Sequence, residues 1–253
     1  KIISKFYNQS FLSVENEQER IGNSFNFNPF DLNEDKLLGL SLNLRNSLFF
    51  NKNLQKYSVT YTFGKTRNKQ QYFIGSQENN LKLHQVTVAH KFKHFWLFEL
   101  LGKTSKNDLV TENFSTRNYN IHSNEIEPKI SFLYDENNRF TAFYHFKNKK
   151  NQLLNFENLA QQKFGLEYFY RSKKKNQISA NINVFLNDFI GETNTPVAYQ
   201  MLEGLQAGKN YTWNVVFNRK LNAFLNLNLN YVGRKSENSK TIHIGNIQLK
   251  AVF

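Results

Sequence analysis

The sequence predicts an all-β protein, an antiparallel up-and-down transmembrane β-barrel of about 12 strands. Three observations lead to this fold class. Apolar and polar residues alternate with a period of two, which places them on opposite faces of a strand. Short turns alternate along the chain with longer loops, as in bacterial outer-membrane barrels. The polar sides of the strands are rich in Asn, Ser, Thr and Gln, which suit water or a hydrated lumen rather than a dry core.

The composition excludes several classes of protein. The chain has 253 residues with 25 Phe and 12 Tyr, yet its mean hydropathy is negative, and no apolar run is long enough for a transmembrane helix. The absence of cysteine excludes disulfides, thiolate metal sites and cysteine nucleophiles. The net charge of +13 fits either solubility or a phosphate-rich membrane surface. The basic residues are scattered, so we expect no nucleic acid partner.

The first part of the chain contains one clear hairpin. Residues 1–15 alternate poorly and predict only a weak first strand, followed by a polar loop over 16–35. Residues 37–50 place Leu on one face and polar residues on the other. A short polar turn at 51–53 then leads to a second alternating strand at 55–65, so the two form an antiparallel hairpin.

The next strand is ambiguous. A loop is expected over 66–78, followed by a strand over 80–92. In this strand Val86 and Val88 indicate one apolar face, whereas Leu83 indicates the other. A β-bulge would reconcile the two patterns, because it changes the face on which later residues lie.

The remaining strands alternate more regularly. Loops are expected at 104–117, 148–159 and 188–198. Pro128 cannot donate to a strand ladder, so we expect a bulge or local break there. The strands between these loops and turns are expected at 95–103, 120–134, 140–147, 162–171, 177–187, 203–218 and 223–234.

The last fourteen residues form a further amphipathic strand with an aromatic end. Every second residue from Gly245 onward lies on one face, which is mostly apolar. If the C-terminus lies in the periplasm, every short turn lies at the periplasmic rim and every longer loop lies outside. Aromatic residues also gather near the short turns, like the girdle of a membrane interface. The pattern therefore predicts the bacterial outer membrane, with the C-terminus at the periplasmic rim.

The end of the chain carries two resemblances. Ile247, Leu249, Ala251 and Phe253 resemble the C-terminal signal by which the barrel-assembly machinery recognises outer-membrane barrels. The tail from Met201 to Asn246 resembles the C-terminal barrel region of large outer-membrane proteins of the Bacteroidota type. That resemblance implies that residues 1–253 are one transmembrane barrel at the end of a longer chain, with no particular enzymatic activity.

We find no catalytic or cofactor motif in the sequence. There is no HExxH motif, phosphate loop or nucleotide-binding glycine fingerprint. The remote enzyme alternative is an outer-membrane phospholipase. Resemblance to that family, which is also a twelve-stranded barrel, implies a Ser–His–Asn arrangement on the lipid face. His243 has the required parity, but no serine in 223–234 matches it. We therefore expect no enzyme, no cofactor and no metal.

The candidate functional residues are charged groups on the polar faces of the strands. They either line a pore that selects ions or solutes, or form a salt-bridge mesh that fills a narrow lumen. The mixed signs favour the mesh. These lumen-facing charges are Arg45, Glu99, Glu125, Glu127, Lys129, Lys147, Glu167, Arg171 and Lys250.

The sequence leaves two functions open. The favoured one is a membrane anchor or scaffold subunit of an envelope transport, secretion or biogenesis assembly. The alternative is a porin-like diffusion channel for small solutes. The expected partners are outer-membrane lipid, lipopolysaccharide, the barrel-assembly machinery and other outer-membrane or periplasmic subunits.

Overall fold

The structure is a single sheet of twelve strands. The computed structural model describes residues 5–19, 37–52, 56–153, 157–172, 176–222, 224–237 and 239–251. Each strand pairs antiparallel with its neighbours in the chain, in the order β1 to β12, which confirms the predicted up-and-down fold. The strands are β1 Phe6–Gln18, β2 Leu37–Phe50, β3 Tyr57–Tyr72, β4 Gly75–Phe92, β5 Trp96–Thr111, β6 Tyr119–Leu133, β7 Asn138–Asn151, β8 Asn158–Arg171, β9 Asn176–Ile190, β10 Gly208–Lys220, β11 Leu225–Ser236 and β12 Ile242–Ala251.

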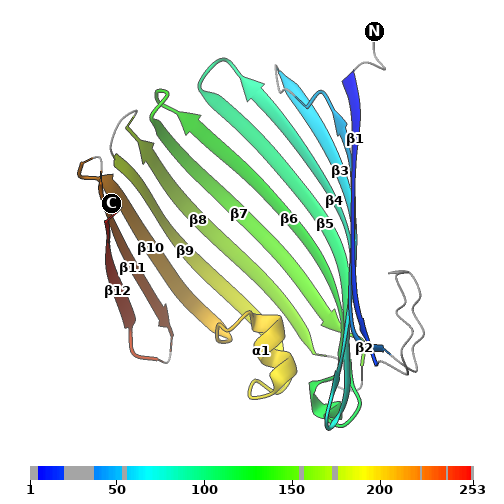
Figure 1. The fold of residues 1–253 in the computed structure, drawn as a ribbon. Helices are drawn as coiled ribbons and strands as arrows, with labels where there is room; N and C mark the ends of the chain where they lie inside the picture. Colours follow the sequence, from blue (N-terminus) through cyan, green and yellow to red (C-terminus); the bar gives the residue numbers. More distant parts are fainter. Residues whose placement is uncertain are drawn as a thin grey trace.

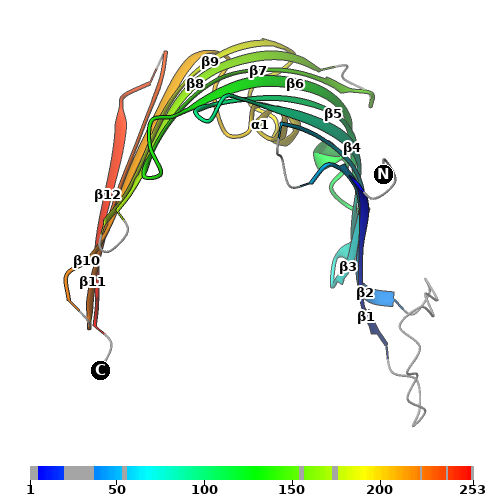
Figure 2. The same ribbon diagram turned by 90° about the horizontal axis from the view of Figure 1, so that it is seen from above.

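The sheet curves into a wide arc. Figure 2 shows β1 and β12 at opposite ends of this arc, with a concave and a convex side between them. Within the described residues, β1 pairs only with β2 and β12 pairs only with β11. The arrangement is therefore a curved wall with two free edges in the part of the chain that the structure describes.

The two rims of the wall differ. One, the short-turn rim at the top of Figure 1, carries the connections from β2 to β3, β4 to β5, β6 to β7, β8 to β9 and β10 to β11. The other, the helix rim, carries the segment 191–207 with helix α1 (Pro196–Leu202), the segment 112–118 with the 3-10 helix η3 (Ser115–Arg117) and the two-residue turn 73–74 between β3 and β4. None of the described helices is long and apolar enough to cross a membrane.

The register places the large apolar side chains on the convex face. Phe98 pairs with Ile130, Ile130 with Ala142, and Ala142 with Leu166. Directly paired residues of antiparallel strands point to the same face, so this row continues across neighbouring strands. Many of these side chains are well exposed, for example Leu166 at 61% and Ile247 at 76%. An apolar face of this size on a single-layer sheet suits contact with lipid.

Several strands are longer than the sequence indicates. The expected loop over 66–78 is wrong, because β3 continues to Tyr72 and β4 starts at Gly75. β4 alone has 18 residues, whereas a tilted strand crosses a bilayer with about 9–11. Beyond the apolar zone both faces of a strand are polar, so the alternation that marks a strand is lost there.

Two local expectations have opposite outcomes. The ladder from β3 through β4 to β5 is continuous, so the bulge expected in 80–92 is absent, and Leu83 lies on the concave face against Gly64. The break expected at Pro128 is confirmed, because the β6–β7 pairing skips Glu127 and Pro128 while keeping its register. The weak first strand also forms, as β1.

One glycine is required by a close approach on the concave face. The ring of Phe143 on β7 lies over Gly165 on β8, its direct register partner. A Cβ atom at Gly165 would lie 2.1 Å from Phe143 Cζ, well inside van der Waals contact. Phe143 is buried, so it has little room to move away.

We therefore predict that Gly165→Ala lowers the stability of the folded protein by about 1–3 kcal/mol, because the added methyl overpacks the Phe143 site. Gly102→Ala is the matched control, since nothing lies within 4 Å of a Cβ at Gly102. Thermal unfolding in detergent, followed by circular dichroism, measures both. Equal unfolding temperatures for the two variants would contradict the packing argument.

Candidate functional site

The concave face carries a folded loop that no sequence pattern indicates. Helix α1 has seven residues, begins with Pro196, and is capped by the hydroxyl of Thr195, which accepts from the Ala198 N–H at 3.0 Å. It ends where Glu203 adopts a left-handed conformation with φ 56°. Figures 1 and 2 show α1 on the inner side of the arc, at the helix rim.

An apolar cluster attaches α1 to the wall. Val197, Met201 and Leu202 of the helix are almost completely buried. They belong to one cluster with Tyr119 and Ile121 of β6 and Leu159 of β8, with Leu109 and Phe189 at its margin. This is the main apolar core of the described residues, because the remainder of the sheet is a single layer.

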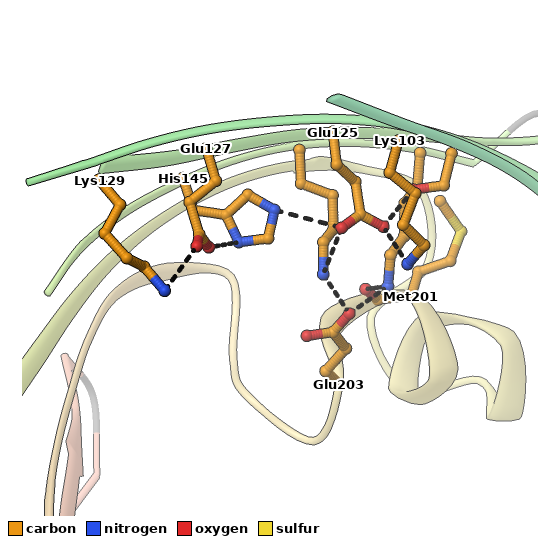
Figure 3. A network of polar contacts seen from close by, with 10 residues as sticks. Lys103, Glu125, Glu127, Lys129, His145, Met201 and Glu203 are labelled. Carbon is orange, nitrogen blue, oxygen red and sulfur yellow. Dashed lines mark hydrogen bonds and ion pairs between the residues drawn. The ribbon is translucent and has the colours of Figure 1, made fainter. Parts of the chain in front are cut away.

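Two lysines of β7 hold the end of the helix. Figure 3 shows Glu203 pointing at the wall. Lys147 Nζ donates to Glu203 Oε1 at 2.7 Å and Lys149 Nζ donates to the same oxygen at 2.9 Å. Lys149 also donates to the Met201 carbonyl at 2.8 Å. Both lysines are only 8% exposed, so the carboxylate that neutralises them is essential to their burial.

The network continues from these lysines along the wall (Figure 3). Glu125 Oε2 lies 4.0 Å from Lys147 Nζ, and Glu125 Oε1 lies 3.1 Å from Lys103 Nζ. His145 lies between two carboxylates, with Nε2 at 3.2 Å from Glu125 and Nδ1 at 3.4 Å from Glu127. Charges of opposite sign therefore alternate across β5, β6, β7 and the α1 loop.

At its far end the network meets aromatic rings. Lys129 Nζ lies 3.4 Å from Glu127 and 5.6 Å from the centre of the Phe143 ring. Lys163 Nζ lies 4.8 Å from the same ring and 5.4 Å from that of Phe185. Cations at these distances over a ring are attracted to its face, so the inner surface is fixed by ion pairs and cation–aromatic contacts together.

A set of amides holds the segment after the helix. The side-chain NH₂ of Asn187 donates to the Gln206 carbonyl at 2.8 Å, and that of Asn210 donates to the same carbonyl at 2.7 Å. Gln161 in turn donates to Asn187 at 3.0 Å. All three amides are at most 5% exposed. The loop is thus attached to the wall both by charge pairs and by neutral hydrogen bonds.

The pKa of Glu203 shows how strongly its surroundings favour its charge. Partial burial alone would raise the pKa of this carboxyl group, but the positive charges and hydrogen bonds of Lys149 and Lys147 outweigh burial and lower it from 4.5 to about 2. Glu203 lies outside the strands, in the loop. The ionised carboxylate of Glu203 therefore contributes to the attachment of α1, beside the apolar cluster and the amide hydrogen bonds.

The register places all nine charges selected from the sequence on the concave side. The structure joins Glu125, Glu127, Lys129 and Lys147 in the network. The other five lie on the same face outside it, paired in register with small, apolar, amide or oppositely charged residues. They are Arg45, Glu99, Glu167, Arg171 and Lys250.

Sequence reasoning missed four members of the network. Lys103 and His145 lie on predicted strands with the inward parity, so that parity could have identified them. Lys149 lies in a segment predicted as loop. Glu203 lies at the predicted start of a strand, but belongs to the α1 loop, which has no periodic signal.

The histidines do not gather into a metal-binding cluster in the described residues. No group of three or more His, Cys, Asp or Glu side chains in the described ranges is arranged to hold a metal ion. His243 lies on the convex face, where its Nδ1 is 2.7 Å from the Tyr231 hydroxyl and its ring stacks on that of Tyr231. Its contacts within the described chain are therefore aromatic, and no serine is among them.

These features define an integral outer-membrane β-barrel protein. It has an all-antiparallel sheet in chain order, an apolar convex face and a polar concave face. Comparison with solved structures supports this fold. No protein-family model and no curated protein matches the chain.

The most informative structural matches are two siderophore receptors. PirA from Acinetobacter baumannii matches with a TM-score of 0.58 at 9% identity, over 100% of this chain and 42% of the receptor. PirA from Pseudomonas aeruginosa matches with a TM-score of 0.57 at 9% identity, over 98% of this chain and 40% of the receptor. At these identities the likeness concerns the fold alone. The chain thus spans less than half the length of these receptors.

We predict that α1 leaves the wall as the pH falls from about 4.5 towards 2. The lowered pKa of Glu203 means that its contribution to docking is complete above its ordinary pKa and is lost as the carboxylate is protonated. A dye attached at Tyr199→Cys, an exposed position of α1 in a chain without native cysteine, reports the release by its fluorescence.

The matched variants test the same point at neutral pH. Glu203→Gln should give the low-pH fluorescence already at pH 7, whereas Glu192→Gln, which changes an exposed carboxylate of the same loop, should behave like the parent. A pH transition that persists in Glu203→Gln would assign the release to another group.

Proposed function

We propose that the chain forms part of the wall of a wide, non-enzymatic transport barrel in the outer membrane, as a subunit or segment of a larger envelope transport assembly. The observation that carries this proposal is the open arc. Twelve strands curve without bringing β1 and β12 together (Figure 2). Free strand edges are not tolerated in lipid, because their N–H and C=O groups lack partners. Further strands are therefore needed to continue the sheet.

The match to the siderophore receptors supports the proposal that the chain is part of a wider barrel. The whole arc superposes on less than half of the receptor from Acinetobacter baumannii, as expected of a segment from a wider barrel. We infer transport from the inner face, whose ion pairs and amides present a hydrated surface of mixed charge.

We propose that the short-turn rim faces the periplasm and the helix rim faces outside. Outer-membrane barrels have short periplasmic turns and longer outer loops. The segment 191–207 is the longest connection that the structure describes in full, and it lies at the helix rim. In this orientation α1 narrows the lumen from the outer side. β12 ends near the short-turn rim (Figure 1), which agrees with a C-terminal assembly signal presented to the periplasm.

Cysteine pairs test whether the twelve strands form a wider wall. We predict that Gln9→Cys, combined with Asn246→Cys, Gln248→Cys or Lys250→Cys in turn, gives no disulfide in native outer membranes, since other strands separate β1 from β12. The positive control is Asn228→Cys with Gln248→Cys, because these residues are direct partners on β11 and β12. An efficient β1–β12 disulfide would show a closed twelve-stranded barrel and refute the proposal.

Solute flux tests the role of α1. We predict that replacing residues 193–206 by a short Gly-Ser turn increases the flux of small hydrophilic solutes through the native protein reconstituted in liposomes, because the lumen is widened at the helix rim. Tyr199→Ala is the control, as this side chain is 70% exposed and lies outside the apolar cluster. Absence of flux in both proteins would favour an anchoring role without transport.

A further inference from the structure

The strand register aligns basic residues in a row across the convex face. The sequence alone does not reveal this row. Lys65 on β3 pairs with Lys82 on β4, and Lys82 pairs with Lys106 on β5. Lys106 pairs with His122 on β6, and His122 pairs with Lys150 on β7. These five residues are separated by 15 or more positions in the chain, yet they form one continuous line across five neighbouring strands. We call them the lysine row.

Such a row is unfavourable unless something neutralises it. Directly opposed side chains of an antiparallel pair have Cβ atoms about 4.5–5.5 Å apart, and like charges at such positions destabilise a sheet. The four lysines are all exposed. No carboxylate in the described part of the chain lies within ion-pair distance of any of them.

The neighbouring carboxylates do not compensate the row. The only acidic residues on the convex face of the described β3 to β7 are Glu78 and Asp108. Glu78 is already bound to Arg67, with Oε1 at 2.8 Å from Nε. The concave face of the same strands is different, because there Lys103, Lys147 and Lys149 each have a carboxylate partner. On the concave face of these described strands Lys91 alone lacks a carboxylate partner, whereas on the convex face all four lysines of the row lack one.

The row lies on the helix-rim side of the apolar zone of each strand. On β3 the convex face is aromatic or aliphatic from Tyr57 to Phe63, and Lys65 comes next. On β7 it is apolar from Phe140 to Phe146, and Lys150 follows after one Asn. The zone just beyond the hydrocarbon of a bilayer is occupied by the polar headgroups. The row thus starts at headgroup depth on the helix-rim side at Lys65, and Lys106 lies further from the apolar zone, since Gly102 and Thr104 separate it from Leu100.

We infer that the lysine row binds the phosphate groups of lipopolysaccharide. In the orientation proposed above, on which this inference rests, the helix rim faces outside, and the outer leaflet there consists of this phosphorylated glycolipid. An extended line of ammonium groups suits a lipid that carries several phosphates better than one that carries a single phosphate. Lysine can also lay its alkyl stem along the apolar surface while its ammonium group reaches the headgroups.

Thermal unfolding of the native protein in detergent, with and without added lipid, tests this inference. We expect lipopolysaccharide to raise the unfolding temperature by several degrees through preferential binding to the folded state. The variant Lys65→Gln/Lys82→Gln/Lys106→Gln should lose most of this shift. The control Lys52→Gln/Lys56→Gln/Lys220→Gln removes the same charge near the short-turn rim and should keep it. Dephosphorylated lipopolysaccharide should give no shift with any protein.

A crossover distinguishes binding from a general loss of stability. Without lipid, the row variant should unfold at the same temperature as the parent or higher, because like charges have been removed; with lipopolysaccharide it should unfold lower. The single variants Lys82→Gln and Lys106→Gln give intermediate shifts if the triple variant does not fold. An unchanged lipopolysaccharide shift in all row variants would overturn the inference.

A phospholipid comparison separates this inference from the orientation on which it rests. We expect phosphatidylglycerol to give little or no row-dependent shift. A row-dependent shift with phosphatidylglycerol that equals or exceeds that with lipopolysaccharide would overturn the assignment and place the row in the inner leaflet. Neither outcome alters the cross-linking and flux results, which test the transport wall separately.

Discussion

The constraint on which this structure depends is that lipid offers no hydrogen bonds to a polypeptide backbone. The continuous antiparallel ladder from β1 to β12 meets this constraint by pairing backbone N–H and C=O groups within the sheet. The same ladder fixes which residues face one another, because a slip of one position would exchange the two faces of a strand. The apolar convex surface, the charged concave surface and the lysine row are therefore all consequences of one register.

The lysine charges on the two faces of the sheet are neutralised in different ways. On the concave face, the nearly buried Lys147 and Lys149 are matched by Glu125 and Glu203, and the α1 loop is held in place by the resulting pairs. On the convex face, exposed lysines lie opposite one another without such partners in the described chain. An inner network neutralised by the protein itself and an outer lysine row left for lipid to neutralise are consistent with a wall between a lumen and a membrane.

The sequence predicts the fold well because the period of two is strong wherever one face meets lipid. The strands at 177–187 and 223–234 are found close to their observed positions for this reason. It predicts the helix-rim ends of the strands poorly, since both faces are polar there, and β3 and β4 extend through a segment that is predicted to be a loop.

The sequence also identifies the inward charges by parity, including Glu125 and Lys147. It does not identify Glu203, because α1 is held by tertiary contacts rather than by a periodic pattern. The lysine row is not visible either, since its members are brought together only by pairing.

The contacts of α1 have a consequence for the order of folding. Every strand pairs with its neighbour in the chain, so the wall can grow one neighbouring strand at a time, and pairing between sequence neighbours is the faster route for a β-sheet. The α1 loop is different, because Lys147 and Glu203 are 56 residues apart in sequence and the apolar cluster joins α1 to β6 and β8. Its docking must wait until β6 to β10 are in place. A docked α1 is therefore a late event, and its appearance marks the completion of this part of the wall.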